Sequence, residues 1–257
     1  MKDLLTAAEQ IVREAGSLAV RMLRDSSIRR HKDHGDIVTD GDVAVERHVI
    51  SSLRQRFPGH GFNSEESPPE NPDAEFVWVL DPIDGTKYYA RALPFYSVAL
   101  ALERRGELVL GLVHCPELDR TYAATRGGGA TLNGQAVRCS DGPHLAEAMI
   151  YLEIPSRHSP PEKREAGLEK MALLVGSALR VRIIGVGSLG LCFCAAGGFD
   201  AYVNLGSAGK YCDYAAGQVI VQEAGGEFRQ AGGHILAGPA ALCDAIAALL
   251  GLSDLGG

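Results

Sequence analysis

The most constraining feature of this sequence is an apolar run, Phe76–Leu80, that ends in the acidic loop Asp81–Thr86, whose sequence is Asp-Pro-Ile-Asp-Gly-Thr. The β-branched and aromatic residues of the run predict a buried strand, and the strand ends near a proline, which cannot donate to a sheet ladder. Gly85 allows close approach of the backbone, so the two carboxylates and the Thr86 hydroxyl can converge. Alone, the loop fits either an acidic helix cap or a site for a hard cation such as Mg²⁺. No soft ligand stands near the loop in the sequence to suggest zinc.

Other acidic residues that are candidates for the same site are spread along the chain. Glu65 and Glu66 form a pair in a short loop, where adjacent glutamates are usually solvated. Asp42 and Asp213 each stand at a predicted helix start, where a carboxylate commonly caps the helix. Each position therefore has a plain structural interpretation beside a metal-binding one.

Periodicity predicts a chain that contains both helices and strands. Apolar residues at three-to-four spacing predict helices, and short β-branched runs predict strands. The polar stretch 29–36 is predicted to be a surface loop that can close over a ligand. Asn133-Gly134 is a strong hairpin signal, so the strands before it are predicted to form an antiparallel meander. The predicted helices are 3–24, a segment that begins near 40, 162–179, 212–224 and 240–250, and the later predicted strands are 95–102, 108–113, 122–124, 181–184, 201–203 and 235–238.

The composition argues against several classes of partner. The chain has 257 residues, 46% of them hydrophobic, which is enough for one large domain or two packed halves. Its net charge of −7 argues against a binder of nucleic acid polymers or anionic membranes, because such proteins depend on clustered lysine and arginine.

The six cysteines show no Cys-x-x-Cys spacing, and the N-terminus has no signal-peptide pattern, so we expect reduced thiols in a cytoplasmic protein.

The segment Gly185–Gly190 matches the dinucleotide fingerprint Gly-x-Gly-x-x-Gly between a predicted strand and an apolar helix. This match keeps a nicotinamide-dependent oxidoreductase open as a distant alternative. However, the acid that should end the next strand comes early, at Asp200. The plainer interpretation is that small residues let this helix start approach a strand or a polar ligand closely.

Taken together, these segments resemble the inositol monophosphatase family of Mg²⁺-dependent, lithium-sensitive phosphatases over nearly the whole chain. The resemblance rests on a Trp-containing strand with its acidic loop, a Glu-Glu pair, an Asp-hydrophobic-Val-Thr segment, and an aspartate before an Ala-Gly helix that ends in Glu-Ala-Gly-Gly. In this chain these motifs stand at 78–86, at Glu65-Glu66, at 36–39 between Lys32 and Asp42, and at Asp213 with Gly217 and 223–226.

The resemblance implies a metal site that is shared between distant segments. Glu65, Asp81 and the Ile83 carbonyl resemble the ligands of a first Mg²⁺. Asp81, Asp84 and Asp213 resemble the ligands of a second, in a site for two or three ions.

The resemblance also implies catalytic roles. Glu65 and Thr86 resemble the pair that orients and deprotonates the attacking water, with Asp42 accepting a hydrogen bond from Thr86. Backbone amides at Gly85 and Thr86 resemble a phosphate-holding helix start.

The chain departs from the family pattern at positions that are expected to contact the substrate. Cys212 replaces the usual tryptophan, and Asn204 stands where inositol phosphatases carry a glutamate, which puts inositol preference in doubt. Lys87 follows Thr86 as in relatives that hydrolyse nucleotide 3′,5′-bisphosphates or histidinol phosphate, and Lys210 can meet a second anionic group or be solvated. The predicted substrate contacts are Gly85, Thr86, Lys87, Val186, Gly187, Asn204 and Lys210.

The sequence thus predicts a mixed α/β chain with the layered αβαβα sugar-phosphatase fold. We expect an N-terminal α+β half, 1–145, that carries the acidic loop, and a C-terminal α/β half, 146–257, that carries Asp213. The expected function is Mg²⁺-dependent hydrolysis of a small phosphate monoester, with inositol-1-phosphate favoured over histidinol phosphate, fructose 1,6-bisphosphate and adenosine 3′,5′-bisphosphate. A catalytically silent phosphate-binding protein is a further alternative, and the family suggests a homodimer.

Overall fold

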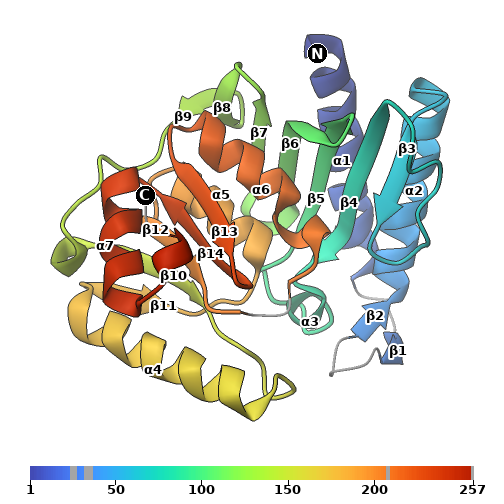
Figure 1. The fold of residues 1–257 in the computed structure, drawn as a ribbon. Coiled ribbons are helices and arrows are strands. Elements are labelled where there is room, and N and C mark those ends of the chain that lie inside the picture. The colour runs from blue at the N-terminus through green and yellow to red at the C-terminus, as the bar shows by residue number, and fades with distance from the viewer. Residues whose placement is uncertain (24–27, 32–36, 207–208, 256–257) are drawn as a thin grey trace.

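The protein folds into two large β-sheets and the helices that cover them (Figure 1). A computed structural model of the chain describes residues 1–23, 28–31, 37–206 and 209–255. Within these residues the large sheets have seven and five strands, and β1 (Ile28–His31) and β2 (Ile37–Thr39) add a two-stranded ribbon. Part of the stretch 29–36 is therefore a strand rather than a loop, and its remainder, 32–36, lies outside the described residues.

The seven-stranded sheet runs in the order β3-β4-β5-β6-β7-β8-β9. β3 pairs with β4 in parallel, and every later pair is antiparallel, which confirms the predicted meander. Asn133 and Gly134 form the last hairpin turn with positive φ values of 49° and 78°, as their sequence predicts. The strands are β3 (Gly61–Ser64), β4 (Phe76–Asp84), β5 (Ser97–Arg104), β6 (Glu107–Cys115), β7 (Arg120–Thr125), β8 (Gly129–Leu132) and β9 (Gln135–Val137).

The five-stranded sheet has the order β11-β10-β12-β14-β13. β10 pairs in parallel with both β11 and β12, whereas β14 pairs antiparallel with β12 and β13. Sequence periodicity missed β10 and β13. The strands are β10 (Met149–Glu153), β11 (Arg180–Arg182), β12 (Ala201–Asn204), β13 (Glu227–Ala231) and β14 (His234–Gly238).

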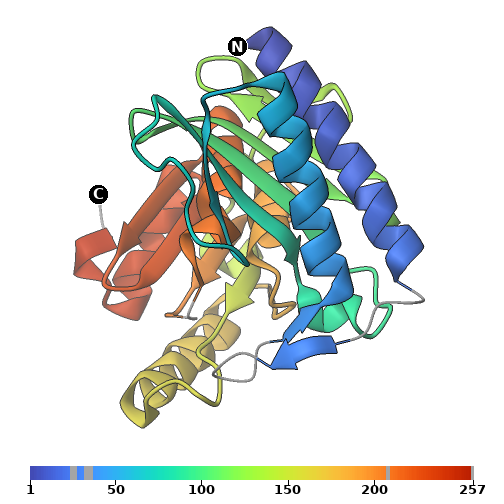
Figure 2. The ribbon, with the colours of Figure 1, turned by 90° about the vertical axis from the view of Figure 1, so that its right-hand side faces the viewer.

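The helices and sheets form five layers in the order αβαβα (Figures 1 and 2). One helix pair covers the outer face of the seven-stranded sheet, a second pair lies between the sheets, and a third covers the far face of the five-stranded sheet. The predicted fold class is therefore confirmed. These pairs are α1 (Lys2–Met22) with α2 (Asp40–Arg56), α5 (Gly187–Ala195) with α6 (Tyr211–Glu223), and α4 (Pro161–Ser177) with α7 (Ala240–Leu250), while short elements are α3 (Thr86–Tyr89) and the 3₁₀ turns Pro116–Leu118, Leu145–Glu147 and Ser253–Leu255.

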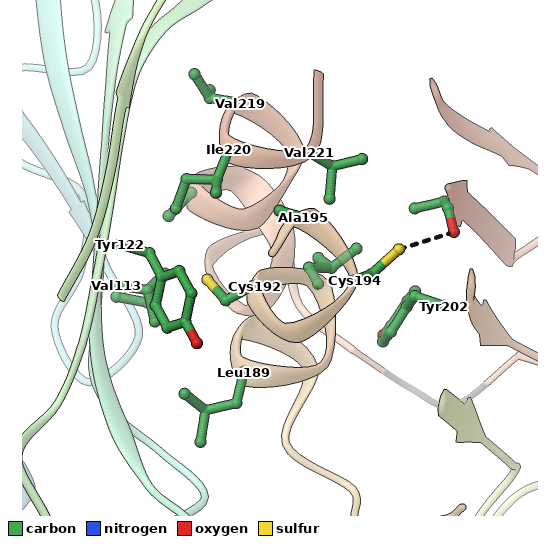
Figure 3. Close-up of a cluster of buried hydrophobic side chains, with 14 of the residues drawn as sticks. Val113, Tyr122, Leu189, Cys192, Cys194, Ala195, Tyr202, Val219, Ile220 and Val221 are labelled. Atoms are coloured by element: carbon green, nitrogen blue, oxygen red, sulfur yellow. Dashed lines mark hydrogen bonds between the residues drawn. The ribbon is translucent and has the colours of Figure 1, made fainter. Parts of the chain in front are cut away.

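Buried apolar side chains of α5 and α6 pack in the middle layer (Figure 3). Glycines on these helices let them approach their neighbours closely. A Cβ built on Gly217 of α6 would lie 2.6 Å from the Leu191 side chain of α5. A Cβ built on Gly190 would lie 2.5 Å from the Tyr151 ring on β10. The last glycine of the apparent dinucleotide fingerprint thus serves contact between a helix and a sheet, as the plainer interpretation holds.

The division of the chain at residue 145 stays a prediction. It falls at the 3₁₀ turn Leu145–Glu147, between the last strand of one sheet and the first strand of the other.

All six cysteines are free and buried. Among the described residues, no helix combines the length and the apolar character needed to cross a membrane.

We expect Gly217→Ala to lower the free energy of unfolding by about 1–3 kcal/mol, because the added methyl group overpacks the contact between α5 and α6. Gly176→Ala is the matched control, since that helical glycine has no atom within 4 Å of its built Cβ. The control should be neutral or stabilising by up to about 1 kcal/mol. Urea unfolding measures both, and equal effects would contradict the packing argument.

Candidate functional site

The first four residues of the predicted acidic loop, Asp81–Asp84, are the last residues of β4, so the strand runs past the proline near which it was predicted to end. The pairing of β4 with β5 becomes irregular there, where Pro82 has no N–H to donate. Asp81 pairs with Ala99 and Asp84 with Ser97, and the register shifts between these two pairs. The Asp81 carboxylate accepts a hydrogen bond from the Ile83 N–H at 3.0 Å. This local contact fixes the first of the two loop carboxylates at the strand end.

Ser188, at the start of α5, fixes the second loop carboxylate, that of Asp84. Its N–H and its hydroxyl both donate to Asp84 Oδ2, at 2.8 and 2.5 Å. The hydroxyl oxygen also lies 2.7 Å from that of Ser97. Sequence reasoning did not single out Ser188 because it is distant in the chain, and its position inside Gly185–Gly190 was the available signal.

The two remaining carboxylates come from the loop after β3 and from the first turn of α6. The Glu65 N–H donates to the Leu80 carbonyl of β4 at 3.1 Å, which ties this loop to the strand. The Asp213 carboxylate accepts from the Lys210 N–H at 2.7 Å, so Asp213 also helps to cap its helix. The Lys210 ammonium lies 2.9 Å from Glu65 Oε1 and so connects the two segments.

Burial and the neighbouring carboxylates raise the pKa values of Asp81, Asp84 and Asp213. Burial is the main cause for Asp81, followed by the charges of Glu65, Asp84 and Asp213. Burial and then Asp213 raise the pKa of Asp84, and burial with the charge of Glu65 raises the pKa of Asp213 to about 6. A bound cation relieves such repulsion, and oxygen donors are those that Mg²⁺ prefers. The donor set therefore fits a hard divalent cation, and the assignment of individual ligands stays a prediction.

The site consists of two adjoining cavities. A cavity of about 170 Å³ contains the acidic cluster, and one of about 350 Å³ lies beside it. Asp84, Lys87, Gly185 and Asp213 line both. The smaller cavity is also lined by Glu65, Asp81, Ile83, Gly85 and Thr86, and the larger by Glu153, Gly187, Tyr202, Asn204 and Tyr214.

Thr86 begins α3 beside the acidic cluster. Its hydroxyl lies 2.9 Å from the Ile83 carbonyl oxygen and 3.2 Å from Asp42 Oδ1, so it can donate to either acceptor. Asp42 also accepts from the Thr39 N–H at 2.8 Å, as the capping interpretation predicts. Burial raises the Asp42 pKa to about 6, against the lowering effect of the Thr39 hydrogen bonds. Asp42 thus caps α2 and contacts Thr86 at the same time.

The predicted substrate contacts fall in different places. Lys87 lines both cavities, and Gly187 and Asn204 line the larger one. Val186 does not line them and is fully buried, while its backbone N–H and carbonyl both bond to the Tyr151 hydroxyl. Lys210 contacts Glu65 rather than the larger cavity. Gly85 has a φ of 94°, and its built Cβ would lie 2.5 Å from the Phe95 carbonyl oxygen, so a larger residue would not fit.

Two glutamates that sequence reasoning missed support the site. Glu46, buried on α2, accepts from the Glu66 N–H at 3.1 Å and from the Ser64 and Ser67 hydroxyls, and so holds the loop that carries Glu65. Glu153 pairs with Asn204 across β10 and β12, which puts a carboxylate into the larger cavity. Both residues lie in segments whose pairing is not visible in the local sequence.

The sequence near the acidic loop holds no soft ligand, but the fold brings a cysteine to it. Cys212 Sγ and carboxylate oxygens of Asp81 and Asp213 all lie within 4.8 Å of one another. Burial and then the charges of Asp81, Asp213 and Glu65 raise the pKa of the Cys212 thiol. The thiol reaches the loop from the start of α6, so neighbourhood in sequence gave no sign of it.

A larger cavity, of about 380 Å³, lies between α4 and the β13–β14 turn. It is lined by Lys163, Lys170, His158 and His234, and none of the described residues that line it carries a carboxylate. Its chemistry therefore differs from that of the acidic cluster, in spite of its size.

The layered fold and the cluster of carboxylates at the end of β4 agree with what the resemblance to a family of phosphatases implies. More narrowly, residues 1–250 match the Inositol monophosphatase family, and the chain belongs to that family. Curated relatives carry two kinds of name. The chain is 33% identical to the Nus factor SuhB of Pseudomonas aeruginosa, over 93% of this chain and 92% of that one. It is 35% identical to human inositol monophosphatase 2, over 88% of this chain and 79% of that one.

Solved structures agree with this assignment. The extragenic suppressor protein SuhB of Bartonella henselae superposes with a TM-score of 0.90 at 27% identity, over 96% of this chain and 98% of that one. The inositol monophosphatase of Anabaena superposes with a TM-score of 0.84 at 26% identity, over 98% and 96% of the two chains. The predicted family and fold are therefore confirmed.

We expect the free energy of unfolding in a chelator to fall as the pH rises from about 4 to about 6. The Asp42 pKa rises from its ordinary value of 3.8 to about 6 on folding. Protonated Asp42 therefore favours the folded state fully below pH 3.8, and this advantage is lost as the pH rises through about 6. Asp42→Asn removes this effect, so the fall in its free energy of unfolding across this range should be smaller than that of the wild type by about 2 kcal/mol. Urea titrations across this range measure both slopes.

Asp141→Asn is the control for this experiment, because the Asp141 side chain is 90% exposed. The other carboxyl groups with raised pKa values also lower the free energy of unfolding as the pH rises, and they do so equally in the wild type and both variants. The test is therefore the difference between the slopes of unfolding free energy against pH. Equal slopes for wild type and Asp42→Asn would contradict the expectation.

Proposed function

We propose that this protein hydrolyses a small phosphate monoester in a Mg²⁺-dependent reaction. The observation that carries the proposal is the meeting of Glu65, Asp81, Asp84 and Asp213, from three separate segments, in one cavity beside Thr86. Membership of a phosphatase family supports the same reaction.

The residues proposed to hold the ions are those that face the smaller cavity. Glu65, Asp81 and the Ile83 carbonyl would hold one Mg²⁺, and Asp81, Asp84 and Asp213 a second, in a site for two or three ions. When bound, such ions neutralise phosphate oxygens and lower the pKa of a coordinated water. The Ser188 hydrogen bonds to Asp84 and the Lys210 amide bond to Asp213 orient these carboxylates before any ion arrives.

Thr86 and Glu65 are proposed to act on the attacking water. The Thr86 hydroxyl can donate to Asp42 at 3.2 Å, which leaves its oxygen lone pairs to accept a hydrogen bond from the water. The Glu65 carboxylate, which lines the same cavity, accepts the proton that the water loses. The backbone amides at Gly85 and Thr86 are proposed to hold the phosphate oxygens.

The larger cavity is proposed to hold the organic part of the substrate. Asn204 both donates and accepts hydrogen bonds, and Glu153 on the neighbouring strand accepts only, so together they suit a ring with several hydroxyl groups. Lys87, on the rim of both cavities, suits the phosphate or a second anionic group. These contacts favour inositol-1-phosphate as the substrate, with histidinol phosphate, fructose 1,6-bisphosphate and adenosine 3′,5′-bisphosphate as rivals.

We expect phosphate release from these four compounds to require Mg²⁺, to be greatest for inositol-1-phosphate and to be inhibited by lithium. Asp84→Asn should lower kcat/KM by at least about 100-fold, because an anchored carboxylate of the metal site is lost. Colorimetric measurement of released phosphate checks each of these expectations.

Asp141→Asn, the same substitution at an exposed surface position, is the matched control and should retain full activity. Full Mg²⁺-dependent release by Asp84→Asn would refute the proposed metal site. Turnover of the nucleotide bisphosphate alone would refute the substrate, and ligand binding without any turnover would favour a silent phosphate-binding protein.

We also propose that the chain forms a homodimer through the region of α4 and β11. Large apolar side chains are exposed there, and Val175 has 60% of its surface accessible. Isolated exposed apolar residues are common, whereas a series within one short region indicates a contact surface. The residues are Leu168, Leu173, Val175, Leu179 and Ile183.

Light scattering of the full chain should give twice the monomer mass, and the Val175→Glu, Leu179→Glu double variant should shift it to the monomer. Leu118→Glu introduces one glutamate at an exposed leucine elsewhere and should leave the mass unchanged. A monomeric wild type would overturn this proposal.

A further inference from the structure

Cys212 gives the acidic cluster a sulfur donor that the proposed Mg²⁺ chemistry does not use. It occupies the first turn of α6, directly before Asp213, and is buried. Its Sγ lies 3.4 Å from Asp213 Oδ1. Within the part of the chain that the structure describes, Asp81, Cys212 and Asp213 form the one group of three such donors whose atoms all lie within 4.8 Å of one another.

Three donors at this spacing can contact one ion. Metal–oxygen bonds of about 2.0–2.2 Å and a metal–sulfur bond of about 2.3 Å span such a group from a common centre. Mg²⁺ takes oxygen ligands and gains little from a thiolate, whereas Zn²⁺ and its chemical relatives bind thiolates well. The thiol therefore changes which cation this cluster favours without changing its carboxylates.

We propose that Cys212 is a ligand for thiophilic divalent cations, which bind through its thiolate together with the carboxylates of Asp81 and Asp213. On binding, the S–H bond breaks, the proton passes to solvent, and a metal–sulfur bond forms with no change of oxidation state. Zn²⁺, Co²⁺ and Cd²⁺ then compete with Mg²⁺ for the site that the proposed function requires. The inference rests on that proposed metal site, although it does not require turnover.

The test uses Co²⁺ and the full chain, because a cobalt–thiolate bond gives near-ultraviolet charge-transfer absorption that cobalt–carboxylate bonds lack. Wild type should develop this absorption on titration with Co²⁺, and Cys212→Ser should not. Direct titration with Cd²⁺, followed by calorimetry, should show at least about a tenfold loss of Cd²⁺ affinity in Cys212→Ser, since even an outer partner of a metal site is worth that much. Mg²⁺ affinity should change far less.

Cys243→Ser is the matched control, because Cys243 is a buried free thiol in the cluster under α7, away from the acidic site. It should retain the absorption of the wild type. Persistence of the band in Cys212→Ser, or its absence from the wild type, would overturn the proposal.

A second measurement needs no variant. X-ray absorption of the wild-type chain with one equivalent of Zn²⁺ should show a sulfur neighbour at about 2.3 Å beside oxygen neighbours at about 2.0–2.2 Å. A shell made only of oxygen and nitrogen would refute Cys212 as a ligand. A chain that shows the sulfur shell but releases no phosphate with Mg²⁺ would refute the proposed function alone, and the reverse result would refute this inference alone.

Discussion

Repulsion among buried carboxylates is the interaction that the rest of the structure has to hold in place. Asp81 and Asp84 are carried by one strand, and Glu65 and Asp213 reach them from separate segments, so four like charges approach one another. Each is restrained by the backbone or by a fixed partner, as Asp81 is by the Ile83 amide. Without these anchors the side chains would turn outward to water, because an isolated buried charge is costly. The anchors make the cluster a preformed place for positive charge.

The middle helix layer joins this electrostatic arrangement to the packing of the two sheets. α5 presents Ser188 to Asp84 at its start, and α6 presents Asp213 at its own start. Both helices meet through the contact of Gly217 with Leu191, so their relative position depends on small side chains. A shift in this packing would therefore move the Asp213 carboxylate on α6 and, on α5, the Ser188 hydroxyl that bonds to Asp84. The packing of the core and the geometry of the site thus depend on the same contacts.

The sequence predicted the features that depend on local pattern. The strand into Asp81, the hairpin at Asn133-Gly134 and the last helix follow from periodicity and turn chemistry, and the family resemblance supplied the chain order of the acids. It did not predict contacts that join distant segments, such as Ser188 with Asp84 or Cys212 with Asp81, because no local rule specifies them. β10 and β13 were also missed, since their place in the sheet is set by neighbours rather than by strong alternation.

The pairing of Glu153 with Asn204 has a consequence for how substrate preference evolves in such folds. Neighbouring strands of a sheet lie about 4.8 Å apart, so an acid can leave one strand and reappear on the next while its charge stays in the same chamber. The family resemblance implies a glutamate where this chain has Asn204. Glu153 on the neighbouring strand lines the same cavity, so a carboxylate faces this cavity although position 204 carries an amide.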